Sequence, residues 1–450
     1  MGRLFGTDGV RGVANKELTP MLAFEIGRAA AFVLAEKQER PVFVIGKDTR
    51  VSGDMLENAL TAGILSVGGN VIKLGVIPTP AVAYLVRHYE ADAGVVISAS
   101  HNSFEYNGIK IFNGDGFKLD DSIEERIEDI VLAHDFAHPE YVGEKLGRCL
   151  EGESNALHTY TEFLLGTMDR RLDGLSVVLD TANGASYQTA KMVYTALGAD
   201  VTMLADEPNG ININEHCGST HPEALQAKVV EIGADIGLAF DGDADRLIVV
   251  DDRGRLVDGD RIICICARML QEEDALFDER VTATVMSNIG LHKYLRERGI
   301  TVDVTKVGDR YVLESMLKSG SVLGGEQSGH MIFLNYTTTG DGVLSSLQFM
   351  KAVLASGKKV SELRDEIEIF PQAMVNVRVM AEGKKKAFDD SEIAARSKAI
   401  EEELKGTGRV LIRPSGTEPL IRVMLEGPDE EIITKYAEEL AAMIGERYGE

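Results

Sequence analysis

The stretch Ala93-Gly-Val-Val-Ile-Ser-Ala-Ser-His-Asn102 joins a short apolar run to a cluster of polar residues. It predicts a buried strand that ends in a loop carrying Ser100 and His101. Upstream, a helical pattern from Thr19 to about Lys37 precedes an apolar strand at Val42–Ile45, and the same helix-strand order then repeats. This alternation predicts a largely parallel sheet with helices on both faces and binding loops at the carboxyl ends of its strands.

Further along the chain the same alternation starts twice more. The strands predicted there are Leu175–Leu179, Asp200–Leu204, Asp235–Phe240, Val281–Met286, Thr301–Val307 and Ser321–Leu323. After Gly357 the pattern changes to a strand, a charged helix at Asp390–Lys405, two strands joined by Pro414-Ser-Gly-Thr, and a closing helix. We therefore expect three related α/β domains with mixed, largely parallel sheets and a C-terminal α+β domain, around one central cleft. The expected domain boundaries are 1–153, 154–254, 255–368 and 369–450.

The amino-acid composition argues against some classes of partner and location. The 450 residues include 72 acidic and 47 basic ones, a net charge of -25, which argues against a nucleic-acid or anionic-membrane partner. An anionic small substrate stays compatible if a few arginines, backbone amides or a metal ion gather in one place. No apolar stretch approaches the roughly 18 residues of a spanning helix, and the opening residues lack a signal-peptide core. We expect a cytoplasmic protein.

The cysteines carry little chemistry. Their number and spacing suit neither a disulfide framework nor a zinc knuckle, and we expect all of them to be buried and reduced. They are Cys149, Cys217, Cys264 and Cys266.

The sharpest local motif is Asp241-Gly-Asp243-Ala-Asp245-Arg246, between an apolar run and a second strand. In an extended segment alternate side chains project to one side, so the three carboxylates would converge. Oxygen ligands of this kind suit magnesium, manganese or calcium. An EF-hand loop needs glycine at its sixth position, where this chain has Arg246. The alternative is a solvated acidic turn, but three stacked acids at the end of a buried strand repel one another without a cation.

Ser100 and His101 stand next to each other, which invites comparison with hydrolases. The surrounding G-x-S-x-G pattern is missing, and the members of a catalytic triad normally come from distant positions. A capping or turn serine explains the motif about as well as a catalytic one. Lys110, a few residues on, adds a cation that can act on a proton or a phosphate.

Two further loops are polar and rich in glycine. Arg413-Pro-Ser-Gly-Thr-Glu-Pro419, with Arg422 on the next strand, offers the hydroxyls, free backbone and arginines that hold a phosphate monoester, although an ordinary hairpin turn is the alternative. Gly324-Gly-Glu-Gln-Ser-Gly-His330 can bind sugar hydroxyls or an amine, or form a simple bend. One motif falls in each predicted domain, which suggests a single cleft built from all four.

These motifs together identify a resemblance. The chain resembles the α-D-phosphohexomutase superfamily over essentially its whole length, and within it the phosphoglucosamine mutases. The resemblance rests on Phe5-Gly-Thr-Asp-Gly-Val-Arg-Gly12, Ser98-Ala-Ser-His-Asn102 and the three motifs above. Gln327 is typical of the glucosamine branch, because glucose and mannose mutases usually carry Met there. Two departures lie beside expected ligands: Ser103 where the family often has Pro, and Ala244 in place of the usual Gly. We expect them to alter loop stiffness and to leave the chemistry intact.

The resemblance also implies a role for each site residue. Ser100 would be the phosphoserine, whose phosphate binds one Mg²⁺ per subunit together with Asp241, Asp243 and Asp245. Glu326 and Ser328 would hold the sugar. The residues implied for the non-reacting phosphate are Arg413, Ser415, Gly416 and Thr417, to which the spacing adds Arg422. Those implied for the reacting end are Arg11, His101, Lys110, Arg246 and His330.

The implied reaction interconverts glucosamine 6-phosphate and glucosamine 1-phosphate through a bisphosphorylated sugar, and feeds UDP-N-acetylglucosamine synthesis. A sugar 1,6-bisphosphate would serve as activator, and Lys110 and His101 are the candidates for proton transfer. The alternatives are a phosphoglucomutase or phosphomannomutase, a metal-dependent phosphatase and a non-catalytic metal-binding protein. The expected partner is a hexosamine phosphate, with no nucleic acid and no membrane. Whether the chain forms a homodimer is left open by the sequence.

Overall fold

The computed structural model describes residues 4–6, 9–35, 40–133, 141–151, 155–380, 383–414 and 420–449. The chain divides into two compact units. The first comprises Met1–Met286 and Ile300–Glu366, and the second comprises Ser287–Gly299 and Ile367–Glu450.

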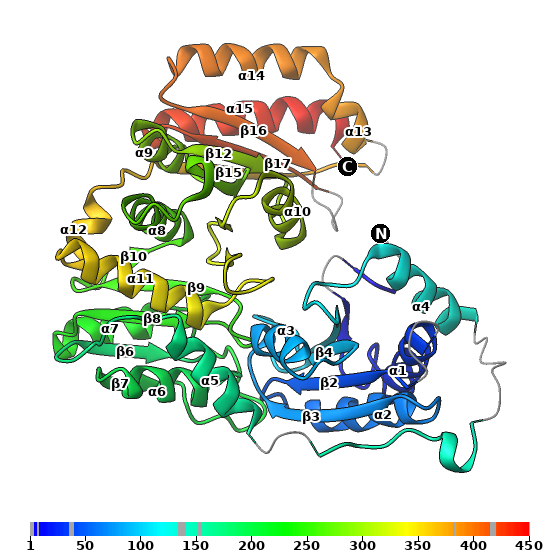
Figure 1. The fold of residues 1–450 in the computed structure, drawn as a ribbon. Helices are drawn as coiled ribbons and strands as arrows, with labels where there is room; N and C mark the ends of the chain where they lie inside the picture. The colour runs from blue at the N-terminus through cyan, green and yellow to red at the C-terminus, as the bar shows by residue number, and fades with distance from the viewer. Residues whose placement is uncertain are drawn as a thin grey trace. The chain divides into compact units, whose positions relative to one another are not determined.

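The first unit contains three sheets (Figure 1). The first has the order β1 (Val10–Val13), β5 (Tyr106–Asn113), β4 (Ala93–Ile97), β2 (Val42–Lys47), β3 (Asn70–Val76). The second has the order β10 (Leu256–Val257), β9 (Leu247–Asp251), β8 (Ile236–Phe240), β6 (Ser176–Asp180), β7 (Asp200–Leu204). The third has the order β12 (Thr301–Thr305), β11 (Arg280–Thr284), β13 (Leu323–Gly325), β14 (Met331–Phe333).

All three sheets share one strand arrangement. The sequences β3-β2-β4-β5, β7-β6-β8-β9 and β12-β11-β13-β14 each pair three parallel strands with a fourth, antiparallel one. The link between the third and fourth strand carries Ser100 in the first repeat, the three aspartates in the second and Glu326 in the third. The prediction of three related α/β domains is confirmed, and three of the predicted motifs occupy equivalent places in them.

Helices cover both faces of the first sheet. Phe43, Ile45 and Val95 share one core with α1 (Pro20–Ala35), α2 (Gly53–Leu65) and α4 (Asp121–Ala133). Gly94 faces the other side, where a Cβ added to it would lie 3.0 Å from Val82 on α3 (Thr79–His88). The first unit also contains α5 (Ala156–Gly166), α6 (Tyr187–Ala196), α7 (Glu223–Ile232), α8 (Gly259–Glu272), α10 (Asp309–Ser319), α11 (Gly342–Ser356), α12 (Val360–Asp365) and the 3₁₀ turns Gly143–Lys145 and Phe277–Glu279.

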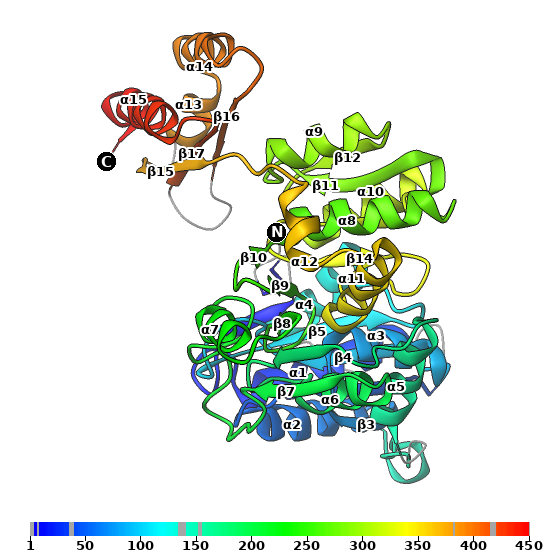
Figure 2. The same cartoon turned by 90° about the vertical axis from the view of Figure 1, so that its left-hand side faces the viewer.

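The second unit is a small α+β domain, as predicted. Its antiparallel sheet has the order β15 (Gln372–Arg378), β17 (Leu420–Glu426), β16 (Arg409–Pro414). Its helices α13 (Gly383–Phe388), α14 (Ser391–Glu403) and α15 (Glu430–Tyr448) pack on one face of that sheet (Figure 2). Asp390 and Asp429 cap α14 and α15 by accepting backbone N–H bonds. Helix α9 (Ile289–Glu297) joins this unit, because the Ile289 N–H donates to Glu426 at 3.1 Å.

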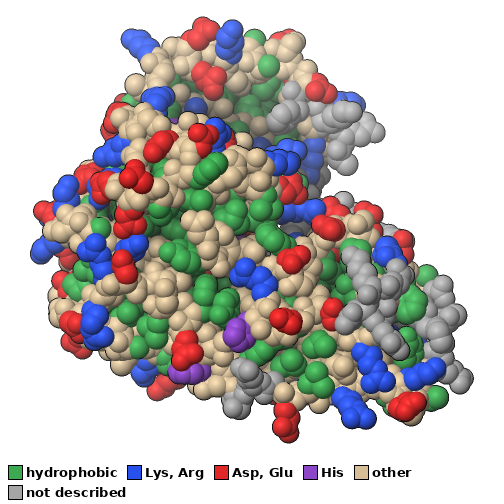
Figure 3. Space-filling view, in the orientation of Figure 1, with side chains coloured by type: hydrophobic (Ala, Val, Ile, Leu, Met, Phe, Trp, Pro, Cys, Tyr) green, Lys and Arg blue, Asp and Glu red, His purple; other side chains and the backbone are tan. Residues whose placement is uncertain are grey.

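Several surface features bear on the expectations from composition. No described helix is long and apolar enough to cross a membrane. Acidic and basic side chains are interspersed over the face of the molecule in Figure 3. Cys217, Cys264 and Cys266 are buried, but Cys149 is exposed, so the expectation that all four cysteines are buried was wrong. Cys149 follows an irregular, largely exposed stretch that has no apolar pattern and does not pack into a core.

Candidate active site

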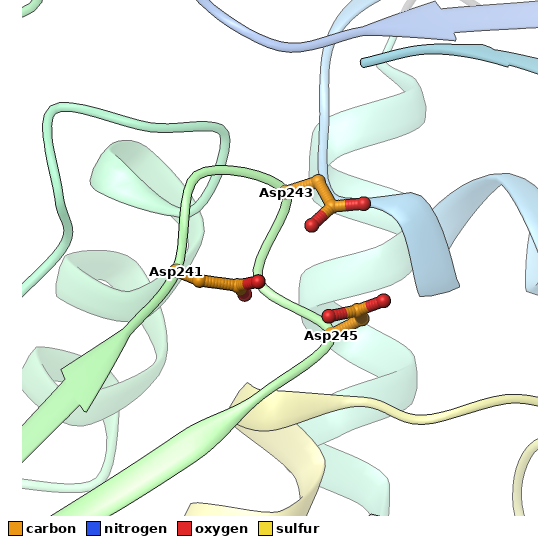
Figure 4. A group of neighbouring side chains, drawn as sticks. All are labelled: Asp241, Asp243 and Asp245. Carbon is orange, nitrogen blue, oxygen red and sulfur yellow. The ribbon is translucent and has the colours of Figure 1, made fainter. Parts of the chain in front are cut away.

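The three aspartates of the metal motif converge in the link between β8 and β9. Figure 4 shows their carboxylates turned toward a common space. One ligand oxygen from each lies within 4.8 Å of the others, and the residues are at most 7% exposed. The extended segment predicted here was wrong. The chain turns, with the Ala244 N–H donating to the Asp241 carbonyl at 3.0 Å and Ala244 at φ +58°, and this turn brings the carboxylates together.

The electrostatics of this cluster favour a cation. Burial, followed by the charges of Asp245 and Asp243, raises the pKa of Asp241 well above the usual range of a carboxyl. Among the described residues, one oxygen each of Asp243 and Asp245 has no hydrogen-bond partner. Buried, crowded carboxylate oxygens with spare lone pairs are the donor set that Mg²⁺ prefers. The residues therefore fit a magnesium ion.

Ser100 contacts this cluster from the link between β4 and β5. Its hydroxyl donates to Asp241 Oδ2 at 2.8 Å and lies 3.3 Å from His101 Nδ1. The residue is buried and has φ +52°, a left-handed conformation that costs a non-glycine residue roughly 1–2 kcal/mol. The first and second domains thus meet where a serine hydroxyl touches a carboxylate of the predicted metal site.

Three basic side chains surround the carboxylates. Lys110 Nζ lies 3.3 Å from Asp243 Oδ2 and 3.9 Å from Asp245 Oδ2. Arg246 Nε lies 3.8 Å from Asp245 Oδ1, and His330 Nδ1 lies 3.5 Å from Asp245 Oδ2. These groups come from β5, from the residue before β9 and from the residue before β14. The structure therefore brings together reacting-end residues that lie far apart in the sequence.

The two histidines are in different environments. Burial, then the nearby Arg246 and Arg11, lowers the pKa of His101 to about 4, so its imidazole is neutral at pH 7 and can accept a proton. His330 Nε2 accepts a hydrogen bond from the Gly340 N–H at 3.2 Å, which orients the ring. A Cβ at position 340 would lie 2.4 Å from that ring, so glycine is required for the close approach.

The predicted sugar loop is attached to the metal domain. The Leu247 N–H donates to the Gly329 carbonyl at 3.0 Å, and Gly329 has φ +94°. Glu326 is half-buried and accepts a hydrogen bond from the Gly308 N–H at 3.0 Å, while Ser328 is exposed. Three of the four predicted loops, including this one, are therefore part of the first unit.

Arg11 lies on β1, opposite Gly108 of β5, on the strand neighbouring that of Lys110.

The fourth loop belongs to the second unit. Arg413 on β16 stands directly opposite Arg422 on β17, and burial together with Arg422 lowers the pKa of Arg413. Like charges opposite each other destabilise a sheet, and an anion between them would remove that cost. Ser415, Gly416 and Thr417 lie outside the described residues.

Some contacts of the site had not been predicted. The Thr79 hydroxyl, at the start of α3, donates to Asp243 Oδ2 at 2.7 Å. Asp48, Arg50 and Asn214 hold the backbone around Ser100. Asp48 and Arg50 follow β2, which had been predicted over Val42–Ile45, so their place near the carboxyl end of that strand was an available indication.

Four family models match successive parts of the chain. They are described as the α/β/α domains I, II and III and the C-terminal domain of phosphoglucomutase/phosphomannomutase, and they match residues 2–138, 158–254, 258–370 and 374–443. A phosphoglucosamine mutase from Ruminiclostridium cellulolyticum is 56% identical over 446 residues, which cover 99% of both chains. The chain belongs to the phosphoglucosamine mutase family. The expected enzyme class, an intramolecular phosphotransferase, follows from this membership.

Solved structures show the fold of this mutase family in distant relatives. A phosphoglucomutase/phosphomannomutase family protein from Burkholderia thailandensis is 24% identical with a TM-score of 0.83, over 99% of this chain and 98% of that one. The N-acetylphosphoglucosamine mutase from Aspergillus fumigatus, in complex with GlcNAc-6P and magnesium, is 17% identical with a TM-score of 0.66, over 98% of this chain and 95% of that one. At these identities the two structures support the fold alone.

Proposed function

We propose that this enzyme interconverts glucosamine 6-phosphate and glucosamine 1-phosphate, with Ser100 carrying the phosphoryl group. The observation that carries the proposal is the 2.8 Å hydrogen bond from the Ser100 hydroxyl to Asp241, inside a buried cluster of three carboxylates. A serine that merely caps a turn has no need of such a neighbour. The phosphoglucosamine mutase name of the relative at 56% identity supports the choice of substrate.

Asp241, Asp243 and Asp245 would hold the metal ion, together with the phosphate on Ser100. The fit of these buried carboxylate oxygens supports Mg²⁺ as that ion. When bound, Mg²⁺ offsets the negative charge of the phosphoryl group in transfer. Arg246, whose guanidinium lies beside the same carboxylates, adds positive charge at this end.

The reaction would consist of two phosphoryl transfers. In the first, the bond between phosphorus and Ser100 Oγ breaks, a bond to the sugar 1-oxygen forms, and the 1-hydroxyl gives up its proton. The bisphosphate then turns over. In the second, the bond to the 6-oxygen breaks, the bond to Ser100 Oγ forms again, and the 6-oxygen takes a proton. Neutral His101, 3.3 Å from Ser100 Oγ, suits the proton transfer better than Lys110, which is engaged with two carboxylates.

The remaining residues would hold the substrate. Glu326 and Ser328 would bind the amino sugar, Arg11 and His330 would line the reacting end, and Arg413 and Arg422 would bind the other phosphate. Ser415, Gly416 and Thr417 would complete that phosphate grip. A sugar 1,6-bisphosphate would restore the phosphoserine when it is lost, and the product would enter UDP-N-acetylglucosamine synthesis.

A coupled assay with Mg²⁺ and a trace of sugar bisphosphate tests this proposal on glucosamine, glucose and mannose phosphates. We expect glucosamine phosphate to be preferred, and Ser100→Ala to lower its turnover at least about 10³-fold because the carrier is lost. Ser103→Ala, on the same loop but with an exposed side chain, is the matched control. A preference for glucose or mannose phosphate would overturn the substrate assignment. Net release of phosphate would identify a phosphatase, and an active Ser100→Ala variant would remove Ser100 from the chemistry.

A further inference from the structure

A buried guanidinium holds the loop that carries Ser100. The Arg50 side chain is fully buried, and its Nη2 donates to the carbonyls of Ser100 at 2.9 Å and of Asn102 at 2.8 Å. Its Nη1 donates to the carbonyl of Tyr106 at 3.0 Å and also to that of Ser103. One side chain thus fixes four carbonyl groups over the whole link between β4 and β5. A rigid fork of five N–H donors makes arginine the side chain suited to this task.

The backbone N–H of Ser100 is held through Asp48, the ion-pair partner of Arg50. Asp48 Oδ2 accepts from Arg50 Nε at 2.8 Å and from the Ser98 hydroxyl at 2.5 Å. The Ser100 N–H in turn donates to the Ser98 hydroxyl oxygen at 3.0 Å. The Asp48–Arg50 pair therefore holds both the N–H and the carbonyl group of Ser100 in place. These contacts can maintain the left-handed φ of +52° at Ser100.

The second domain acts on the same carbonyl groups. Asn214 Nδ2 donates to the carbonyls of Ser100 at 2.9 Å and Asn102 at 3.0 Å. Gly242 of the metal loop packs so closely that a Cβ there would lie 2.6 Å from the Ser100 carbonyl oxygen. The backbone of Ser100 is thus a shared contact of the serine loop and the metal loop.

The neighbours of Arg50 in the chain tie it to the same domain. The Thr49 hydroxyl donates to the Asn183 carbonyl at 2.5 Å, and the Val51 N–H donates to the Gly210 carbonyl at 2.9 Å. Asp48 and Arg50 therefore contact the serine loop, whereas Thr49 and Val51 contact the second domain.

We propose that Arg50 is a positioning residue for phosphoryl transfer: with Asp48 and Asn214, it holds Ser100 in the left-handed conformation that presents its Oγ to the metal loop. This inference rests on the proposed role of Ser100 as phosphoryl carrier. The Arg50 side chain is fully buried and bonded to Asp48 and to backbone carbonyls, so it would act through the Ser100 backbone. A displacement of about 1 Å at a reacting group costs on the order of 10² in rate, so the loss of these contacts is measurable.

The experiment uses the dephosphorylated full-length enzyme and radiolabelled glucose 1,6-bisphosphate in a single turnover. The bond between phosphorus and a sugar oxygen breaks, a bond to Ser100 Oγ forms, and the serine proton passes to the sugar oxygen. The variants are Arg50→Lys, which keeps the charge but not the fork, and Asn214→Ala. The control is Arg280→Lys. Arg280 is the first residue of β11, at the end of the strand away from the functional loops, and its Nη1 lies 2.7 Å from Asp303 on β12.

We expect Arg50→Lys to label Ser100 about 10–100-fold more slowly per folded molecule, with KM for glucosamine 6-phosphate within about 2-fold of wild type. Asn214→Ala should slow labelling about 3–10-fold, and Arg280→Lys should label at the wild-type rate. If Arg50→Lys does not fold, Asn214→Ala alone decides. Labelling at the wild-type rate in the folded variants, or a loss that matches only the unfolded fraction, overturns the positioning role. An unlabelled wild-type enzyme would instead overturn the role of Ser100 itself.

Discussion

The two predicted ends of the site are built in different ways. At the reacting end, in the first unit, Ser100 and the three aspartates are buried and hydrogen-bonded across two domains. The predicted phosphate grip, in the second unit, uses Arg413 and Arg422 on adjacent strands, on the face of the sheet opposite α13, α14 and α15. Both arginines are half-buried. The predicted reacting end would therefore depend on preorganised geometry, and the predicted phosphate grip on concentrated charge.

This difference has a kinetic meaning. Groups in a buried, water-poor site act strongly on charge that develops during transfer, so changes there should lower kcat. Arginines that grip a non-reacting phosphate bind ground state and transition state alike, so changes there should raise KM. Substitutions in the two regions test whether this division holds.

The largest effect is expected for Asp241→Asn. Activity should fall at least about 10³-fold, because the variant loses a carboxylate of the predicted Mg²⁺ site. The pKa of Asp241 is raised by burial and by the neighbouring acids, so its charge destabilises the metal-free fold, and the variant should melt at a higher temperature than wild type in EDTA. Thermal melts with and without Mg²⁺ measure this, and Mg²⁺ should raise the melting temperature of wild type much more than that of the variant.

The control for this comparison is Asp180→Asn, which changes another buried carboxylate at the end of β6. Asp180 accepts backbone N–H bonds from Ala182 and Gly218, so this variant should lose some stability and keep the response to Mg²⁺. An unchanged Mg²⁺ response in Asp241→Asn would contradict the metal assignment.

A smaller effect is expected in the second unit. Arg413→Ala and Arg422→Ala should each raise KM for glucosamine 6-phosphate about 10–100-fold, the equivalent of one charge-assisted hydrogen bond, and change kcat by less than about 5-fold. Each should melt no lower than wild type, because the facing like charges are removed. Steady-state kinetics and thermal melts give both quantities.

Arg396→Ala is the matched control, since Arg396 pairs with Glu439 on the helix side of the same unit. It should leave KM unchanged. If Arg413→Ala lowered kcat and left KM as it is, the division between geometry and charge would fail.

The sequence indicated the serine and metal loops because each follows a strongly apolar strand, and strand order places these two and the sugar loop at equivalent links. Other parts were indicated only by their position or not at all. Arg50 lies near the carboxyl end of a predicted strand, but the backbone carbonyls that Arg50 and Asn214 bind are 50 and 114 residues away in the chain, and no spacing pattern encodes such contacts. Strand β5 was not predicted because polar residues, Tyr106, Asn107 and Lys110 among them, interrupt its apolar pattern. The turn of the metal loop depends on the positive φ of Ala244, which its residue type does not predict.

A still smaller effect, on stability alone, is expected at Asp341. Burial raises the pKa of this carboxyl to about 6, while it accepts hydrogen bonds from the Tyr160 hydroxyl and the Leu344 N–H. The folded state therefore binds a proton that the unfolded state has already released, and wild type loses stability as pH rises from about 4 to about 6. Asp341→Asn removes this loss, so its melting temperature relative to wild type should rise by a few degrees between pH 4 and pH 7 and then level off.

Tyr160→Phe is the companion variant for this prediction. It removes a hydrogen bond that favours the charged carboxylate and so raises the pKa of Asp341 further, and the loss of stability should be larger and extend to higher pH than in wild type. A melting-temperature difference that is constant with pH in both variants would show that Asp341 does not titrate in this range.

The smallest effect is expected for Ala244→Gly. Ala244 adopts φ +58°, which is unfavourable for a residue with a Cβ, and its carbonyl accepts the Gly342 N–H at 2.9 Å. Glycine would relieve the strain but enlarge the entropy of the unfolded chain, so the two terms largely cancel and the free energy of unfolding should change by less than about 1 kcal/mol. Because neighbouring contacts such as that of Gly342 already define the turn, kcat should stay within about 2-fold. A larger drop in kcat would show that the stiffness of alanine itself keeps the carboxylates in place, and that preorganisation at the reacting end extends to single backbone angles.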